Sequence, residues 1–157
     1  NELVMLMPAA DSARAQIAAS QQEAQDTYKS MTDEFQVKYQ QYQQKSSTWT
    51  PAIRESKEKE LQDIQTRIQD FDQSIQQELQ QQQQQLMAPI QQRAVAAVEK
   101  LAKEGGYIYV FEKASMLYVD ETQSVDLTSA ARKALNIPDG RTLETLQQEL
   151  QAQAQKQ

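Results

Sequence analysis

The chain has 157 residues, which suits one domain of ordinary size, and only 39% of them are apolar, a low share for a compact globule. It contains no histidine and no cysteine, so it lacks the commonest general base, the commonest metal ligand and any thiol nucleophile. We therefore expect no enzyme activity, no catalytic residue, no metal site and no cofactor. The net charge of −6 argues against nucleic-acid partners, and no apolar run is long enough for stable membrane insertion.

A first long helix is predicted from residue 9 to residue 46, a stretch without glycine or proline. Pro8 suits its first turn, where a backbone N–H is not needed. A second helix is predicted over residues 51–104. In both helices, large side chains recur at alternating steps of three and four residues, the heptad pattern of a coiled coil. The predicted seam between the helices consists of Ile17, Tyr28, Met31, Phe35, Leu61, Ile64, Ile68, Phe71 and Ile75.

The segment Ser46–Pro51 is predicted to connect the two helices. Thr50 suits the N-cap of the second helix and Pro51 its first helical position. Because the connection is only a few residues long, the helices should lie antiparallel as a hairpin. Pro89 interrupts the second helix and should act as a hinge there. In such a hairpin Pro89 falls at the level of Pro8, so we expect a helical arm at residues 9–89.

The remaining residues, 1–8 and 90–137, are predicted to form a body. The pair Gly105-Gly106 should end the second helix, and β-prone runs predict short strands at about 107–111, 116–119 and 125–127, followed by a helix at 128–136. Residues 138–157 form a polar, helix-prone tail. So few strands leave exposed edges, which predicts a symmetric oligomer. Six residues should form either the core of a barrel or the packing between subunits of this oligomer: Tyr107, Ile108, Val110, Phe111, Leu117 and Val119.

The sequence resembles the Skp/OmpH family of periplasmic chaperones over about residues 1–137. An apolar segment, Glu2–Met7, leads into the helical hairpin. The more specific signature follows: Val98-Glu-Lys-Leu-Ala-Lys-Glu-Gly-Gly-Tyr-Ile-Tyr-Val-Phe111, then Leu117-Tyr-Val-Asp120, then Asp126-Leu-Thr-Ser-Ala-Ala-Arg-Lys-Ala-Leu135. A helix, a Gly-Tyr strand, a Leu-Tyr strand and an Asp-Leu-Thr helix in this order are typical of the family.

The resemblance implies a mainly α homotrimer, in which three small bodies build one β-barrel and three hairpin arms enclose a cavity. It implies an ATP-independent holdase for unfolded outer-membrane proteins, located in the periplasm. It also implies that a signal peptide and a first strand precede Asn1. The arms depart from the family's pattern, because residues 9–104 hold more acidic than basic side chains. We therefore expect glutamine amides to replace the usual basic groups in contacts with clients.

Four apolar or aromatic residues near the tip of the arm, at residues 46–51, are candidates for binding unfolded clients: Val37, Tyr39, Trp49 and Ile53. Such side chains suit a promiscuous binder, since they supply contact area without demanding one partner sequence. Trp49 has a second interpretation, as a plug that closes the end of the hairpin. The protein as a whole also has a second interpretation: it could be a structural coiled-coil scaffold or spacer of the cell envelope that binds no client.

Overall fold

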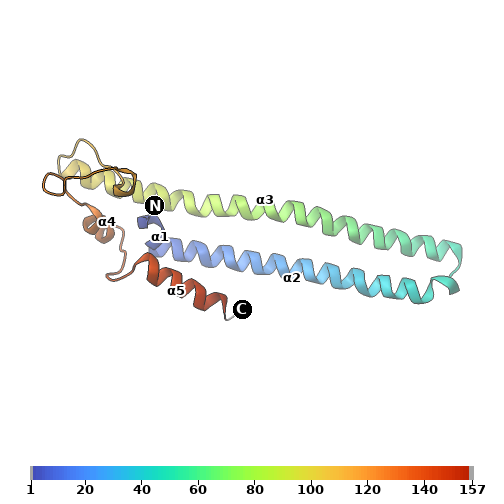
Figure 1. The fold of residues 1–157 in the computed structure, drawn as a ribbon. Coiled ribbons are helices and arrows are strands. Elements are labelled where there is room, and N and C mark those ends of the chain that lie inside the picture. The colour runs from blue at the N-terminus through green and yellow to red at the C-terminus, as the bar shows by residue number, and fades with distance from the viewer. Residues whose placement is uncertain (1, 156–157) are drawn as a thin grey trace. The chain divides into compact units, whose positions relative to one another are not determined.

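The computed structural model describes residues 2–155, and its regular structure is mainly helical, as predicted (Figure 1). Two long helices dominate the chain, which confirms the mainly α class. The helices are α1 (Glu2–Leu6), α2 (Pro8–Lys45), α3 (Pro51–Glu104), α4 (Thr128–Ala134) and α5 (Leu143–Ala154), with short 3-10 helices at Ser46–Thr48 and Lys113–Ser115.

The chain divides into two compact units. The hairpin unit comprises residues 15–84. The terminal unit comprises the residues up to 14 together with those from 85 onward. Helices α2 and α3 each contribute to both units, because the division falls within them.

The hairpin unit reverses direction at the predicted position. Helix α2 ends at Lys45, and one 3-10 turn follows. Trp49 then adopts an extended conformation with φ −86° and ψ 148°. Thr50 caps the next helix, since its Oγ1 accepts a hydrogen bond from the Ile53 N–H at 3.4 Å. Pro51 begins α3, where its fixed φ is already helical and its missing N–H costs nothing.

Four polar contacts establish the antiparallel register of the hairpin. Lys38 pairs with Glu60, and the Tyr42 hydroxyl donates to Glu58. Arg67 Nη2 lies 3.3 Å from Glu34 Oε2, and Gln82 Nε2 lies 2.9 Å from Ser20 Oγ. The midpoint between the residue numbers of each pair lies in the turn, between 49 and 51. The helices of this unit therefore keep one antiparallel pairing along its length, with a small shift between its two ends.

The terminal unit has its own apolar core. Helices α1 and α5 are in contact there. The side chains of Leu6 and Ala10 are completely buried, and Leu146 of α5 is only 3% exposed. The buried cluster consists of Leu6, Met7, Ala10, Ala13, Ile90, Ala94, Leu135, Ile137 and Leu146. Thus residues from both ends of the chain share one core.

Two helices of the terminal unit end in residues with positive φ. Gly106 (φ 69°) follows α3, and the Tyr107 N–H donates to the Ala102 carbonyl at 2.9 Å. Asn136 (φ 55°) follows α4, and the Ile137 N–H donates to the Arg132 carbonyl at 2.9 Å. Both have the hydrogen bonds of a Schellman motif, which satisfies carbonyl groups left over at a helix end.

The strands predicted at 107–111, 116–119 and 125–127 are not formed, and residues 2–155 contain no β-strand. The backbone on either side of Lys113–Ser115 is extended, with φ −69° and ψ 123° at Glu112 and φ −98° and ψ 138° at Met116. A strand needs a neighbour for its N–H and C=O groups, and one chain offers too few. The helix predicted at 128–136 does form, but it ends at Ala134 because Asn136 turns the chain.

Replacing Ile64 by alanine should lower the free energy of unfolding by about 2–4 kcal/mol, because this side chain is buried in the hairpin unit. Urea unfolding followed by circular dichroism measures the change. Ile53→Ala is the matched control, since Ile53 lies on the same helix and is 46% exposed. Equal losses in the two variants would contradict the assignment of Ile64 to the seam.

Candidate functional site

Three of the four candidates near the turn present their side chains to solvent. Val37 is 55% exposed, Tyr39 is 45% exposed and Ile53 is 46% exposed. The Tyr39 ring stacks on the Phe35 ring, with centroids 5.9 Å apart and planes 7° apart. Val37 and Tyr39 lie on α2 and Ile53 lies on α3, so their exposure does not depend on the conformation of a loop. The turn end of the hairpin unit therefore carries apolar groups on rigid elements.

Trp49 is arranged differently from these three residues. It is half-buried, and its ring meets the Tyr42 ring edge to face at a centroid distance of 5.9 Å. The Tyr42 hydroxyl is itself bound to Glu58 on the opposite helix, and this hydrogen bond raises the pKa of Tyr42. Trp49 thus packs onto the last cross-helix contact of the hairpin. This geometry favours the interpretation of Trp49 as a plug.

The predicted seam residues are more shielded than their neighbours, with one exception. Ile64 is only 2% exposed, whereas Tyr28 is 43% exposed. The others are partly buried: Ile17, Met31, Phe35, Leu61, Ile68, Phe71 and Ile75. An open groove in the hairpin unit lies where polar residues such as Ser20, Thr27 and Gln82 alternate with Phe71 and Ile75. Apolar packing along the seam is therefore narrow.

Ion pairs supplement this narrow seam near the turn. Glu60 on α3 binds Lys38 on α2 and also Lys57, whose Nζ lies 2.9 Å from Glu60 Oε2. The hydrogen bond from Lys38, followed by that from Lys57, lowers the pKa of Glu60 to about 2. Glu60 therefore stays charged in all but strongly acidic solution.

The segment after α3 exposes a second group of apolar side chains. Leu117 is fully exposed, and Ile108 is 85% exposed. The rings of Tyr109 and Phe111 lie 6.0 Å apart. Of the residues predicted for an oligomer core, Tyr107, Ile108, Val110, Phe111 and Leu117 are exposed, and Val119 is half-buried. The segment contains local polar contacts, such as the exposed ion pair of Lys113 with Glu121 at 2.8 Å.

Pro89, the predicted hinge, lies within α3, and the helix continues through it to Glu104. Its side chain is exposed, while the following Ile90 is buried in the core of the terminal unit. Proline lacks the N–H that would bond the carbonyl four residues earlier, so one backbone hydrogen bond is missing at this point. The residue therefore marks a local weakness in an otherwise continuous helix.

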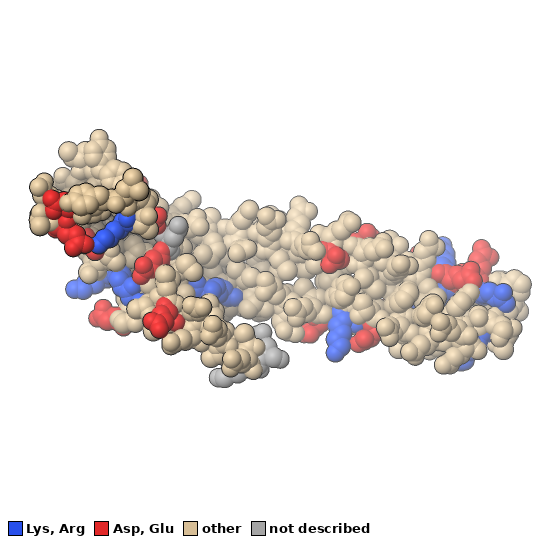
Figure 2. Space-filling view, viewed as in Figure 1, with Lys and Arg blue, Asp and Glu red and all other residues tan. Residues whose placement is uncertain are grey.

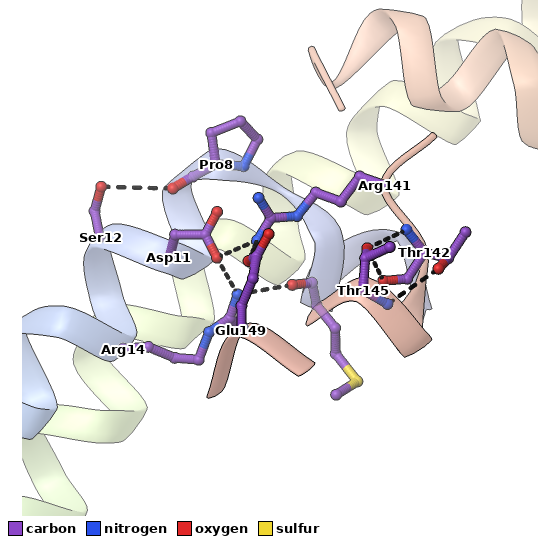
Figure 3. A network of polar contacts seen from close by, with 9 residues as sticks. Pro8, Asp11, Ser12, Arg14, Arg141, Thr142, Thr145 and Glu149 are labelled. Atoms are coloured by element: carbon purple, nitrogen blue, oxygen red, sulfur yellow. Dashed lines mark hydrogen bonds and ion pairs between the residues drawn. The ribbon is translucent and has the colours of Figure 1, made fainter. Parts of the chain in front are cut away.

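A polar cluster around Asp11 was not predicted from the sequence. Its carboxylate binds Arg14 of the same helix and Arg141, whose Nη2 lies 2.6 Å from Asp11 Oδ1 (Figure 3). Arg14 also donates to the Met5 carbonyl at 3.0 Å. Glu149 Oε2 lies 3.7 Å from Arg141. The only available signal was the leucine spacing at 143, 146 and 150 on a helix-prone segment, which indicated an apolar stripe but not its partner.

Charged groups elsewhere are interspersed. On the face shown in Figure 2, acidic and basic side chains alternate without a continuous basic field. Within residues 2–155, no three His, Cys, Asp or Glu side chains are grouped to hold a metal ion. None of the helices in the described part of the chain has the length and apolar character needed to cross a membrane.

Comparison with known proteins identifies the family. Residues 1–135 match the outer membrane protein family described as OmpH-like. The chain belongs to the Skp/OmpH family. At the level of the family, this supports a periplasmic chaperone of outer-membrane proteins, and the family is not known for enzymes. No curated protein matches the chain significantly. The matched region ends before α5, which begins at Leu143.

Acidification should weaken the hairpin unit through Glu60. Because the folded pKa of Glu60 is about 2 and its ordinary value is 4.5, its contribution is complete above pH 4.5 and is lost as the pH falls toward 2. The pair is partly solvent-exposed, so the loss in unfolding free energy should stay below about 1 kcal/mol. Urea unfolding of the wild type and of Glu60→Gln at pH 7 and pH 2.5 measures this loss of unfolding free energy. An equal pH-dependent loss in both proteins would exclude Glu60 as the source.

Proposed function

We propose that this protein is an ATP-independent holdase, which keeps unfolded outer-membrane proteins soluble in the periplasm within a cavity formed by the helical arms of an oligomer. The observation that carries the proposal is the set of apolar side chains held exposed on the helices of the hairpin unit: Val37, Tyr39 and Ile53. Membership of the Skp/OmpH family gives this surface its expected partner.

Client capture would use many weak contacts. Each exposed aromatic or aliphatic side chain contributes little, but several arms that engage one unfolded chain together raise the overall affinity through effective concentration. The glutamine-rich faces add amide donors and acceptors that can pair with unfolded backbone. Such contacts require no fixed client sequence, as expected for a chaperone with many clients.

Oligomerisation would supply what the segment after α3 lacks. Ile108, Phe111 and Leu117 are exposed in the single chain, and their backbone groups have no neighbouring strand. Equivalent segments from other copies could pair with them and bury these side chains. We propose three copies around a shared β-barrel, as the family resemblance implies, with Tyr107, Val110 and Val119 in the same core.

Pro89 would let the arms adjust to clients of different size. A missing hydrogen bond lowers the cost of bending α3 at this residue. The mixed polar and apolar seam of the hairpin unit would also bend more readily than a close-packed apolar seam. We therefore assign Pro89 the role of a hinge.

Aggregation of a client tests the holdase activity. Dilution of a urea-unfolded outer-membrane β-barrel protein into buffer should cause light scattering that the wild-type chain suppresses at stoichiometric ratios. Tyr39→Ser combined with Ile53→Ser should raise the ratio needed for half-suppression about threefold, because contacts are lost from every arm of the oligomer.

Val95→Ser is the matched control for this experiment, since Val95 is 57% exposed but lies in the terminal unit. It should suppress scattering as the wild type does. A wild-type chain that fails to suppress aggregation would favour the structural scaffold instead. Equal activity of the double variant and the control would show that Tyr39 and Ile53 do not bind the client.

The mass in solution tests the oligomer. Light scattering combined with small-angle X-ray scattering should give the mass of three chains of 17.9 kDa each. Ile108→Asp with Leu117→Asp should reduce the mass to that of one chain, because charges would be buried without partners in the barrel. Val37→Asp should leave it unchanged. A monomeric wild type would refute the proposed assembly.

A further inference from the structure

Helix α5 lies beyond the region matched to the family, and within the terminal unit it contacts α1 and joins the apolar cluster through one side chain. Its leucines follow one face, but only Leu146 is buried, at 3% exposure. Leu143 and Leu150, on either side, remain 42% and 41% exposed. A single anchoring side chain makes a contact that can form and break more easily than a fully buried helix face.

A cluster of charges fastens one end of this helix. Arg141 precedes α5 and is bound to Asp11 at 2.6 Å, with Glu149 at 3.7 Å (Figure 3). The helix itself is stabilised locally, because the Thr145 N–H donates to Thr142 Oγ1 and the Thr142 N–H donates to Thr145 Oγ1. This capping box does not depend on contact with α1 or α2. The first turn of α5 can therefore stay helical when the apolar contact opens.

The buried cluster that Leu146 of α5 joins is apolar, and the charged Asp11 directly follows Ala10 of this cluster. Leu6 and Met7 are buried at 0% and 1% exposure in the same cluster as Leu146, and Leu3 and Val4 pack against this cluster. Departure of α5 would remove Leu146 from this cluster and expose part of its apolar surface. Exposed apolar patches of this kind mark interaction sites, and methionine adapts to partners of different shape.

We propose that α5 is a detachable strap over an apolar binding site of the terminal unit, and that unfolded client chains compete with it for this site. The identity of the competitor rests on the proposed holdase function. The seated helix shows which chemistry the site accepts: a leucine-sized side chain close to a basic group that pairs with Asp11. Unfolded segments with an aliphatic side chain near Arg or Lys would meet the same requirements.

A dye tests the strap without any client. In the full chain, Leu146→Asp and Arg141→Gln should each increase the fluorescence of anilinonaphthalene sulfonate about twofold or more, because opening of the strap exposes apolar surface. Their matched controls are Leu150→Asp on the exposed part of the same helix and Arg93→Gln, an exposed arginine of α3. Circular dichroism checks that α2 and α3 remain folded. Equal dye binding in release variants and controls would overturn the strap.

A spin label tests the competition. The chain has no natural cysteine, so one label can be placed on Leu150→Cys alone. Addition of urea-unfolded outer-membrane β-barrel protein should then produce a mobile component in the spectrum as α5 leaves its site. A spectrum that stays unchanged while the client co-elutes with the chaperone would overturn the competition.

Aggregation assays separate this inference from the proposed function. Leu146→Asp and Arg141→Gln should reach half-suppression at about half the wild-type ratio, because the competent state no longer has to be released from the strap. If they match their controls while the wild type is active, the competition is wrong and the holdase function stands. If no variant suppresses aggregation, the holdase function has failed, and the dye result alone decides whether α5 is a strap.

Discussion

A helix pairs its backbone N–H and C=O groups within its own chain, whereas a strand must find a neighbour, and this difference governs which parts of the protein fold alone. Helices α2 and α3 satisfy their backbone internally and need only a narrow seam to lie antiparallel in the hairpin unit. The runs 107–111, 116–119 and 125–127 have the composition of strands but form none, and most of their side chains are exposed. The same constraint makes partner copies the natural source of the missing edges.

The hairpin shows how a polar sequence can still specify one register. Its apolar seam positions are few, and one of them, Tyr28, is 43% exposed. Glu60 and Glu58 compensate by binding Lys38 and Tyr42 on the opposite helix. Polar contacts of this kind contribute little to stability, but they discriminate against a shifted pairing. Apolar side chains such as Val37 and Ile53 are thereby left exposed on the outside.

The parts of the structure that were predictable from sequence depend on local rules. Heptad spacing predicted the helices, and Thr50-Pro51 predicted where the second one starts, because caps act within a few residues. The strand predicted at 107–111 is not formed in the described residues, because strand pairing is non-local and one chain offers too few neighbours. The contact of Arg141 with Asp11 was unpredictable for a related reason, since it joins residues 130 positions apart. Exposure of Val37 and Tyr39 followed from their positions off the heptad seam, whereas burial of Leu146 required knowledge of its partner.

The two guanidinium groups that share the carboxylate of Asp11 have an evolutionary consequence. Both arginines bind Asp11 Oδ1. Arg14 does so from the same helix, and Arg141 does so from the far end of the chain. Loss of this carboxylate would remove a partner from both arginines at once, and Arg14 also holds the Met5 carbonyl at the end of α1. Positions 11 and 141 should therefore be inherited together. Lineages that shed the C-terminal helix should be less constrained at position 11, where Arg14 would remain as a partner.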